Sequence, residues 1–294
     1  MTSLNGIIVV NKPREFTSFD VVAVVRGCLH TKKVGHSGTL DPMATGVLPV
    51  FVGGATKAIS LLPDHDKSYR AGFRLGLTSD TLDIWGDCSE QKNVDISTEI
   101  LRKALEKFRG DIEQIPPMYS ALKVNGQKLC DLARKGIEVE RKPRKVTITR
   151  LELVSFDGRD GVLDVDCSSG TYIRSLVDDI GLELGTGAVM TALERTRACG
   201  FSLGESVSVD ELRALSDEER LKLLKPVESV FSDYSVIQLD EAQTRLYLNG
   251  VRLDTKRLHG DFGEGIYRVY GDGFIGLAKI QNNELISMKR FNGE

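Results

Sequence analysis

Residues 35–50 read GHSGTLDPMATGVLPV and contain three glycines, two prolines and one carboxylate. Gly38 and Gly46 permit backbone conformations that a Cβ atom would forbid. Pro42 moves Asp41 out of the helical region and into an extended conformation. A carboxylate fixed in this way lies on a shaped loop or strand end, where chemistry is usually placed. The plainer interpretation is an Asp-Pro turn between a helix and a buried strand.

The chain on either side of this stretch predicts alternating strands and helices. Residues 6–11 form a short apolar run that is typical of a buried strand. Thr17 and Ser18 are candidate N-caps for a helix through Arg26. A second helix is predicted to begin at residue 54 and to run through residue 62.

Further elements are predicted downstream of residue 67. The strand patterns cover residues 68–76, 146–156 and 162–168. The helical patterns cover residues 97–108, 175–184 and 209–224. Residues 78–87 are polar and rich in turn formers, which predicts a loop. The pattern of residues 188–197 fits a helical or an extended stretch equally well.

The segment at about residues 115–146 is irregular and basic. It holds a Pro pair, an Asn-Gly turn signal and a short helical stretch near residues 129–134. Residues 121–150 carry nine Lys or Arg against three acids, whereas residues 205–241 carry ten acids against four Lys or Arg. This asymmetry indicates one anion-binding face and one ordinary solvated face, although a solvated surface loop also explains the basic segment.

The last part of the chain has the pattern of a separate small unit. Residues 237–291 hold short strand patterns punctuated by Asn-Gly and Asp-Gly pairs. This pattern predicts a small all-β barrel after a boundary near residue 230.

Bulk properties describe an ordinary globular protein. The 294 residues are enough for one large domain or two unequal ones, and the net charge of −3 does not by itself indicate a nucleic-acid partner. Five cysteines without a Cys-x-x-Cys pair predict a reduced cytoplasmic protein. The four histidines have no metal-ligand spacing. The sequence shows no signal peptide and no long apolar span, so no membrane association is expected.

The stretch GHSGTLDPMATGVL resembles the signature of the TruB-type tRNA pseudouridine synthases, which modify uridine 55 in the T-arm loop of tRNA. PPMYSALK, at residues 116–123, resembles the RNA-gripping insertion of that family. The resemblance implies an α+β pseudouridine-synthase fold, with a mixed, largely antiparallel central sheet and flanking helices. It also implies that residues 1–230 form the catalytic domain and that residues 235–294 form a PUA-like RNA-binding barrel.

The same resemblance implies the site residues and their roles. Asp41 is the implied catalytic carboxylate, Arg174 is the cation that pairs with it, and Tyr69 is the active-site tyrosine. A two-pronged guanidinium is expected to hold Asp41 in one rotamer. The residues implied to bind the substrate are His36, Tyr172 and Leu193. Those expected to contact RNA are Lys123, Arg141, Lys142, Arg144 and Lys145.

The implied reaction is an isomerisation and therefore needs neither a metal nor a redox cofactor. The implied partner is the T-arm stem-loop of tRNA, with no protein partner and a monomeric enzyme in the cytoplasm. Two other functions stay open from the residues. One is an RNA-binding or tRNA-folding protein without turnover, although a pure binder does not need Asp41, Tyr69 and Arg174 together. The other is a glycosidase, which usually needs two carboxylates; Asp83 is too loosely placed in the pattern to be the second.

Overall fold

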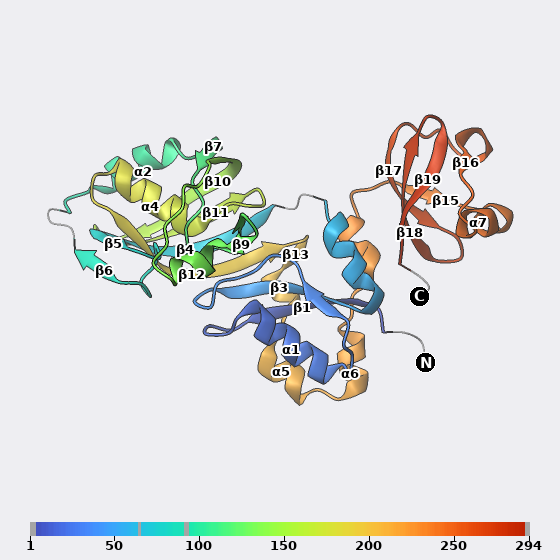
Figure 1. Ribbon diagram of the computed structural model, residues 1–294, viewed down its shortest axis with the longest axis horizontal. Coiled ribbons are helices and arrows are strands. Elements are labelled where there is room, and N and C mark those ends of the chain that lie inside the picture. Colours follow the sequence, from blue (N-terminus) through green and yellow to red (C-terminus); the bar gives the residue numbers. More distant parts are fainter. Residues whose placement is uncertain (1–3, 64–65, 91–93, 292–294) are drawn as a thin grey trace.

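A ten-stranded sheet forms the frame of the N-terminal part (Figure 1). The computed structural model describes residues 4–63, 66–90 and 94–291. The main strand order is β14-β1-β3-β12-β4-β11-β10-β7; in addition, β2 pairs with β3 and β13 pairs with β12. The strands are β1 (Gly6–Lys12), β2 (Val34–His36), β3 (Thr45–Val52), β4 (Lys67–Leu75), β7 (Gly110–Gln114), β10 (Arg144–Phe156), β11 (Asp160–Cys167), β12 (Ala188–Ala198), β13 (Phe201–Ser202) and β14 (Val207–Ser208). The β1–β14 and β3–β12 pairs are parallel and the others are antiparallel, which confirms the predicted mixed sheet.

Helices flank this sheet, and their caps are visible in the sequence. The helices are α1 (Ser18–Cys28), η1 (Gly53–Leu61), α2 (Thr98–Glu106), α4 (Ile173–Glu183), η2 (Leu203–Glu205), α5 (Val209–Ala214), α6 (Asp217–Lys222) and η3 (Val227–Phe231). Thr17 caps α1 in a reciprocal capping box with Asp20, so the predicted start is confirmed. The single helix predicted over residues 209–224 is wrong, because Ser216 forms a second capping box and starts α6 separately.

Strand β12 resolves the ambiguity that the sequence leaves at residues 188–197. It is extended and lies between β3 and β4 in the middle of the sheet. Leu193 and Arg195 are paired with Ala71 and Tyr69 of β4, and Arg195 is also paired with Gly46 of β3. Pairing on both sides satisfies the backbone of this stretch, which local periodicity alone does not predict.

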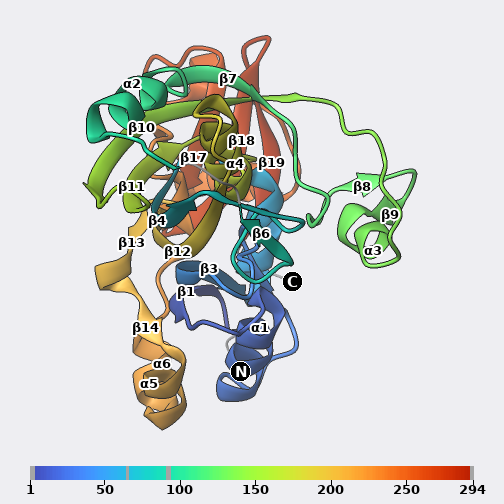
Figure 2. The same cartoon turned by 90° about the vertical axis from the view of Figure 1, so that its left-hand side faces the viewer.

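Two small hairpins project from the main sheet. One pairs β5 (Leu77–Ser79) with β6 (Cys88–Glu90), and the other pairs β8 (Lys123–Val124) with β9 (Gln127–Lys128). Asn125 and Gly126 join β8 to β9 with positive φ angles of 51° and 83°, as a tight hairpin turn requires. Helix α3 (Leu129–Ala133) follows directly, and Figure 2 shows this β8–β9–α3 segment standing apart from the sheet. The predicted turn and short helix of the insertion are confirmed.

The C-terminal part is a curled five-stranded sheet of order β15-β17-β18-β19-β16. Its elements are β15 (Val236–Gln238), α7 (Glu241–Leu248), β16 (Leu253–Asp254), η4 (Thr255–Arg257), β17 (Gly265–Tyr270), β18 (Phe274–Gln281) and β19 (Glu284–Arg290). This small β unit confirms the predicted fold class, while α7 is an addition that the strand pattern does not predict. Phe291 stacks on Phe274 and packs against Phe231, which joins the unit to the N-terminal part.

The helices in the described ranges do not include a membrane-spanning helix. None of them combines the length with the apolar composition that crossing a bilayer requires.

Candidate active site

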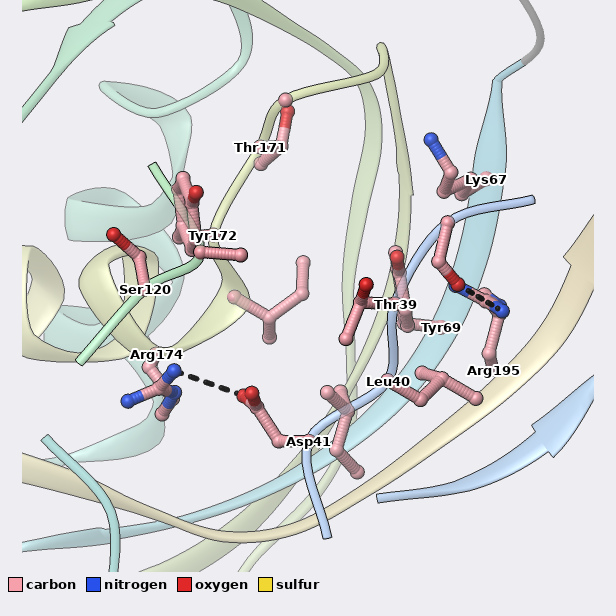
Figure 3. Close-up of a pocket in the computed structure, with 15 residues that line it drawn as sticks. Thr39, Leu40, Asp41, Lys67, Tyr69, Ser120, Thr171, Tyr172, Arg174 and Arg195 are labelled. Atoms are coloured by element: carbon pink, nitrogen blue, oxygen red, sulfur yellow. Dashed lines mark hydrogen bonds and ion pairs between the residues drawn. The ribbon is translucent and has the colours of Figure 1, made fainter. Parts of the chain in front are cut away.

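A pocket of about 280 Å³ opens where the Asp41 stretch meets β4, β12 and the start of α4. It brings together five of the predicted site residues, which lie far apart in the sequence (Figure 3). These residues are Asp41, Tyr69, Tyr172, Arg174 and Leu193. The insertion contributes Ser120 and Ala121 to the wall. The pocket therefore combines a carboxylate, three cationic side chains and two aromatic rings.

The backbone on both sides of Asp41 is anchored to the N-terminal elements. Leu40 N–H donates to Ser18 Oγ at 2.9 Å, and Glu15 N–H donates to the Pro42 carbonyl at 2.8 Å. Ala44 N–H donates to the Asp41 carbonyl at 3.0 Å and closes a turn. The Asp41 side chain stays 39% exposed. The sequence therefore fixes the backbone and leaves the carboxylate open to the pocket.

Lys12 holds the backbone next to Asp41 through hydrogen bonds from its ammonium group. Its side chain is buried, and Nζ donates to the carbonyls of Pro13, Phe16 and Pro42 at 2.9, 2.6 and 3.4 Å. Burial lowers the pKa of the Lys12 ammonium to about 8, although the charge of Asp41 acts in the opposite direction. A buried ammonium near Asp41 places a positive charge behind the carboxylate.

Arg174 forms the ion pair with Asp41 that the sequence predicts. Its side chain is only 5% exposed, and Nη2 lies 2.9 Å from Asp41 Oδ2. Nη1 donates to the Thr81 carbonyl at 2.9 Å, and Nη2 also donates to the Tyr119 carbonyl at 2.8 Å. The two-pronged pairing expected from the sequence is wrong, because the guanidinium divides its donors among several partners.

Asp83 is one of those partners, although the sequence analysis rejected it as a second catalytic carboxylate. Arg174 Nε lies 3.8 Å from Asp83 Oδ2, and the Asp83 side chain is 10% exposed. Asp83 Oδ1 accepts hydrogen bonds from Thr81 Oγ1 and Trp85 N–H at 2.9 and 3.0 Å. The sequence pattern, in which Asp83 is too loosely placed to be a second catalytic carboxylate, did not reveal these contacts. The Asp83 carboxylate is fixed on Arg174 and occupied by its own loop.

Tyr69 lies on β4 and is almost fully buried. Burial raises the pKa of the Tyr69 phenol, and the neighbouring Arg195 guanidinium acts in the opposite direction. Tyr69 is therefore a neutral phenol at pH 7. It presents a flat ring and a hydroxyl to the pocket.

Tyr172 and Leu193 frame the pocket from α4 and β12. The backbone of Tyr172 is fixed by the buried side chain of Gln114, which accepts from Tyr172 N–H at 2.8 Å and donates to its carbonyl at 3.0 Å. Leu193 is buried and adds an apolar surface. This arrangement suits a flat, partly apolar ring of a ligand.

His36 is not among the residues that line the pocket. It ends β2, and its ring lies edge-on to Phe19 with the centroids 5.4 Å apart. Phe19 is 70% exposed, so the pair reaches the surface. Burial, and then the charge of Arg195, lower the pKa of the His36 imidazole. The neutral imidazole is therefore favoured at this position.

The predicted RNA-contacting residues divide into two groups. Lys123, Lys142, Arg144 and Lys145 are exposed on the insertion and on the start of β10. Arg141 is instead occupied inside the insertion, where its guanidinium donates to the Pro116 carbonyl at 3.2 Å and to Glu138 Oε1 at 3.1 Å. Four of the five side chains are thus available to an anion.

A metal centre is not formed by the described residues, since no three of their His, Cys, Asp and Glu side chains gather as ligands. His65 lies outside the described residues. The charged side chains that line the pocket are Asp41, Lys67, Arg174 and Arg195, and Lys12 lies close enough to Asp41 for their charges to interact.

Two residues of this environment, Lys12 and Arg195, were not identified in the sequence analysis, and Asp83 was considered there only as a second carboxylate. Lys12 directly precedes Pro13 at the end of an apolar strand, which was a usable signal for a buried cation. Arg195 lies within a stretch whose conformation the sequence left open. Its burial follows from the strand pairing, which no local pattern reveals.

Comparison with known proteins places the chain in a family. Residues 26–173 match the TruB family pseudouridylate synthase (N terminal domain), and residues 174–232 match the tRNA pseudouridylate synthase B C-terminal domain. A tRNA pseudouridine synthase B of Clostridium tetani is 44% identical over 94% of this chain and 96% of its own length. The protein of the same name from Fusobacterium nucleatum is 45% identical over 96% of this chain and 98% of its own length.

Solved structures agree with the family match. A chain in the crystal structure of a Cbf5-Nop10-Gar1 complex is 27% identical, with a TM-score of 0.73, over 97% of this chain and 84% of that chain. The sequence matches cover nearly the full length of this chain and of its relatives. The chain therefore belongs to the TruB family of pseudouridylate synthases.

Proposed function

We propose that this protein isomerises uridine 55 in the T-arm loop of tRNA to pseudouridine, with Asp41 as the catalytic carboxylate. The observation that supports the proposal most directly is the Asp41 carboxylate, which is partly exposed to the pocket. It is paired with the buried Arg174 at 2.9 Å and lies beside two tyrosine rings. The family supports the same reaction, because its curated relatives are named tRNA pseudouridine synthase B.

The reaction makes specific demands on the pocket. The N1–C1′ glycosidic bond breaks, the uracil turns over, and a C5–C1′ bond forms. The proton on C5 is lost and N1 gains a proton, so the product is an isomer of the substrate. Because the base is stacked in the folded RNA loop, it must first be extruded into the site.

The residues of the pocket meet these demands in separate roles. Asp41 acts at the sugar or the base, and Arg174 orients its carboxylate. Tyr69 offers its ring to the extruded base, since stacking on an aromatic side chain contributes about 1–3 kcal/mol. Its hydroxyl is placed to assist transfer of the C5 proton. Tyr172 and Leu193 close the pocket around the uracil.

The surface around the pocket is proposed to hold the RNA. His36, beside the exposed Phe19, enters the RNA loop and helps to open it. Lys123, Lys142, Arg144 and Lys145 contact phosphates, while Arg141 keeps the insertion in shape.

The domain division completes the proposal. Residues 1–230 form the catalytic domain with the insertion at about residues 115–146, and residues 235–294 form a PUA-like RNA-binding domain. The protein acts as a monomer on tRNA in the cytoplasm.

One experiment separates this function from its alternatives. The protein is incubated with an unmodified tRNA transcript, and pseudouridine is mapped by chemical labelling while released uracil is quantified. We expect stoichiometric pseudouridine at position 55 and no free uracil. Free uracil indicates a hydrolase, whereas tight binding without either product indicates an RNA-binding protein.

A further inference from the structure

Arg195 is a buried arginine whose hydrogen bonds reach the backbone on both sides of Asp41. It is 1% exposed, the largest of the fully buried side chains. Nε donates to the Val47 carbonyl at 2.7 Å, and Nη2 donates to the Gly38 carbonyl at 3.0 Å. These two carbonyls bracket Asp41 in the sequence. One planar group therefore ties the beginning of the loop that carries the carboxylate to β3, the strand that follows it.

The position of Arg195 in the sheet links that loop to Tyr69. In the strand register, Arg195 is opposite Gly46 of β3 on one side and Tyr69 of β4 on the other. Figure 3 shows Arg195 beside Tyr69, with its bond to the Gly38 carbonyl. The Asp41 loop and Tyr69 are thus both held against Arg195.

The packing around Arg195 leaves little room for an alternative arrangement. Gly46 has a φ of +103°, and a Cβ on it would meet the Arg195 backbone. Gly38 has a φ of +74°, and a Cβ on it would lie 3.3 Å from Arg195 Nη1. Gly46 therefore allows the backbone of β12 to approach β3, and Gly38 leaves space for the guanidinium. In the described part of the chain no carboxylate forms an ion pair with Arg195, and backbone carbonyls accept the hydrogen bonds of its guanidinium.

We propose that Arg195 is a positioning residue. It holds the segment from Gly38 to Val47 in place and thereby fixes the Asp41 carboxylate relative to Tyr69. The proposal rests on the proposed function for its effect on turnover, but its effect on the loop does not. Arginine suits this role because its rigid fork reaches two separated acceptors, whereas a lysine ammonium is a single point of charge.

The test compares Arg195→Lys with the parent and with a matched control, Arg220→Lys. Arg220 is also a carbonyl-bridging arginine, with a side chain 14% exposed and bonds to the carbonyls of Leu212, Cys28 and Arg213. It lies outside the pocket lining. Each protein is assayed below its melting temperature for single-turnover pseudouridine formation, tRNA Kd and hydrogen exchange of residues 38–47.

We expect Arg195→Lys to slow the single-turnover rate about 100-fold, because small misplacements of a reacting group have effects of this size. The tRNA Kd should change less than about threefold, since the RNA surface is untouched. Amide exchange in residues 38–47 should accelerate in Arg195→Lys and stay at the parent level in Arg220→Lys. If Arg195→Lys does not fold, Gly38→Ala perturbs the same contact from the loop side and is assayed in its place.

Two results overturn the proposal. One is parent-like turnover and exchange in Arg195→Lys. The other is an equal loss of turnover in both arginine variants, which indicates a general loss of stability. If the parent itself forms no pseudouridine, the proposed function fails, and the exchange comparison still decides whether Arg195 holds the segment in place.

Discussion

The loop that carries Asp41 and the insertion at about residues 115–146 both form walls of the same pocket, but they are held very differently. The Asp41 loop lies between β2 and β3, and nearly every residue of β3 is buried. Ser18, Lys12 and Arg195 bind its backbone directly. The insertion contains two-residue strands and a five-residue helix, and most of its side chains are exposed.

This difference separates two tasks of an RNA-modifying site. A carboxylate that acts on one bond benefits from a position fixed before the substrate arrives. A surface that follows an RNA backbone tolerates, and often uses, local adjustment. Arg174 connects the two regions, since its Nη2 contacts both Asp41 Oδ2 and the Tyr119 carbonyl of the insertion.

The largest effect should come from Asp41→Asn, which removes the charge and keeps the shape. We expect pseudouridine formation to fall about 10⁴-fold or more, because the proposed catalytic carboxylate is lost. Folding and tRNA affinity should be retained, as the loop is anchored through its backbone. Single-turnover assays and tRNA binding measure the two quantities separately. Full activity of this variant would remove Asp41 from the mechanism.

Arg174→Lys should have the next largest effect, because it disturbs the connection between the two regions. Lysine keeps the charge near Asp41 but cannot also satisfy the Thr81 and Tyr119 carbonyls. We expect a loss of turnover of about 10²-fold and a loss of stability of about 1–3 kcal/mol from unsatisfied buried groups. Thermal unfolding and single-turnover assays measure the two effects.

Arg70→Lys is the matched control for that variant. Arg70 makes a two-pronged pair with Asp164 at 2.9 Å, and its side chain is 54% exposed. Exposed ion pairs contribute little to stability, so we expect turnover and melting close to those of the parent. Equal effects of the two substitutions would show that Arg174 has no special role at the pocket.

The same two regions show how far the sequence alone reaches. The Asp41 loop was predictable because Gly, Asp and Pro act locally, and the Asn-Gly turn of the insertion was predictable for the same reason. The missed features depend on neighbours that are distant in the sequence. Asp83 faces Arg174 only after α4 and the β5–β6 hairpin come together, and β12 is extended because two strands pair with it. Local patterns carry no information on such contacts.

A smaller effect is expected when three exposed cations of the insertion and the adjoining strand are neutralised. Lys142, Arg144 and Lys145 are replaced by glutamine together. Each lost phosphate contact reduces the salt dependence of binding, so the log–log slope should flatten by about 2 and affinity at low salt should fall about tenfold. Single-turnover rates at saturating protein should stay near those of the parent. Binding titrations at several salt concentrations give the slope.

Arg141→Gln provides the internal control for this measurement. Its guanidinium is occupied by the Pro116 carbonyl and Glu138, so its loss should loosen the insertion and leave the salt slope unchanged. A slope that flattens for Arg141→Gln but not for the triple variant would reverse the assignment of these cations.

The smallest effect concerns His36 and the pH dependence of stability. Burial and the Arg195 charge hold the pKa of His36 below its ordinary value, and Nδ1 is buried without a hydrogen-bond partner among the described residues. The unfolded chain therefore binds a proton more readily than the folded protein does. The stability contributed by neutral His36 is complete above the unfolded pKa of about 6.5 and is lost as the pH falls through the lower folded value.

His36→Gln removes this pH-dependent contribution to stability. The Tm of the variant should therefore fall less than that of the parent between pH 7.5 and 5.5, by about 2 °C. His259→Gln should melt like the parent at both pH values, because His259 is 81% exposed. An equal fall in Tm for the parent and His36→Gln would show that the folded protein does not hold this imidazole in a buried, neutral state.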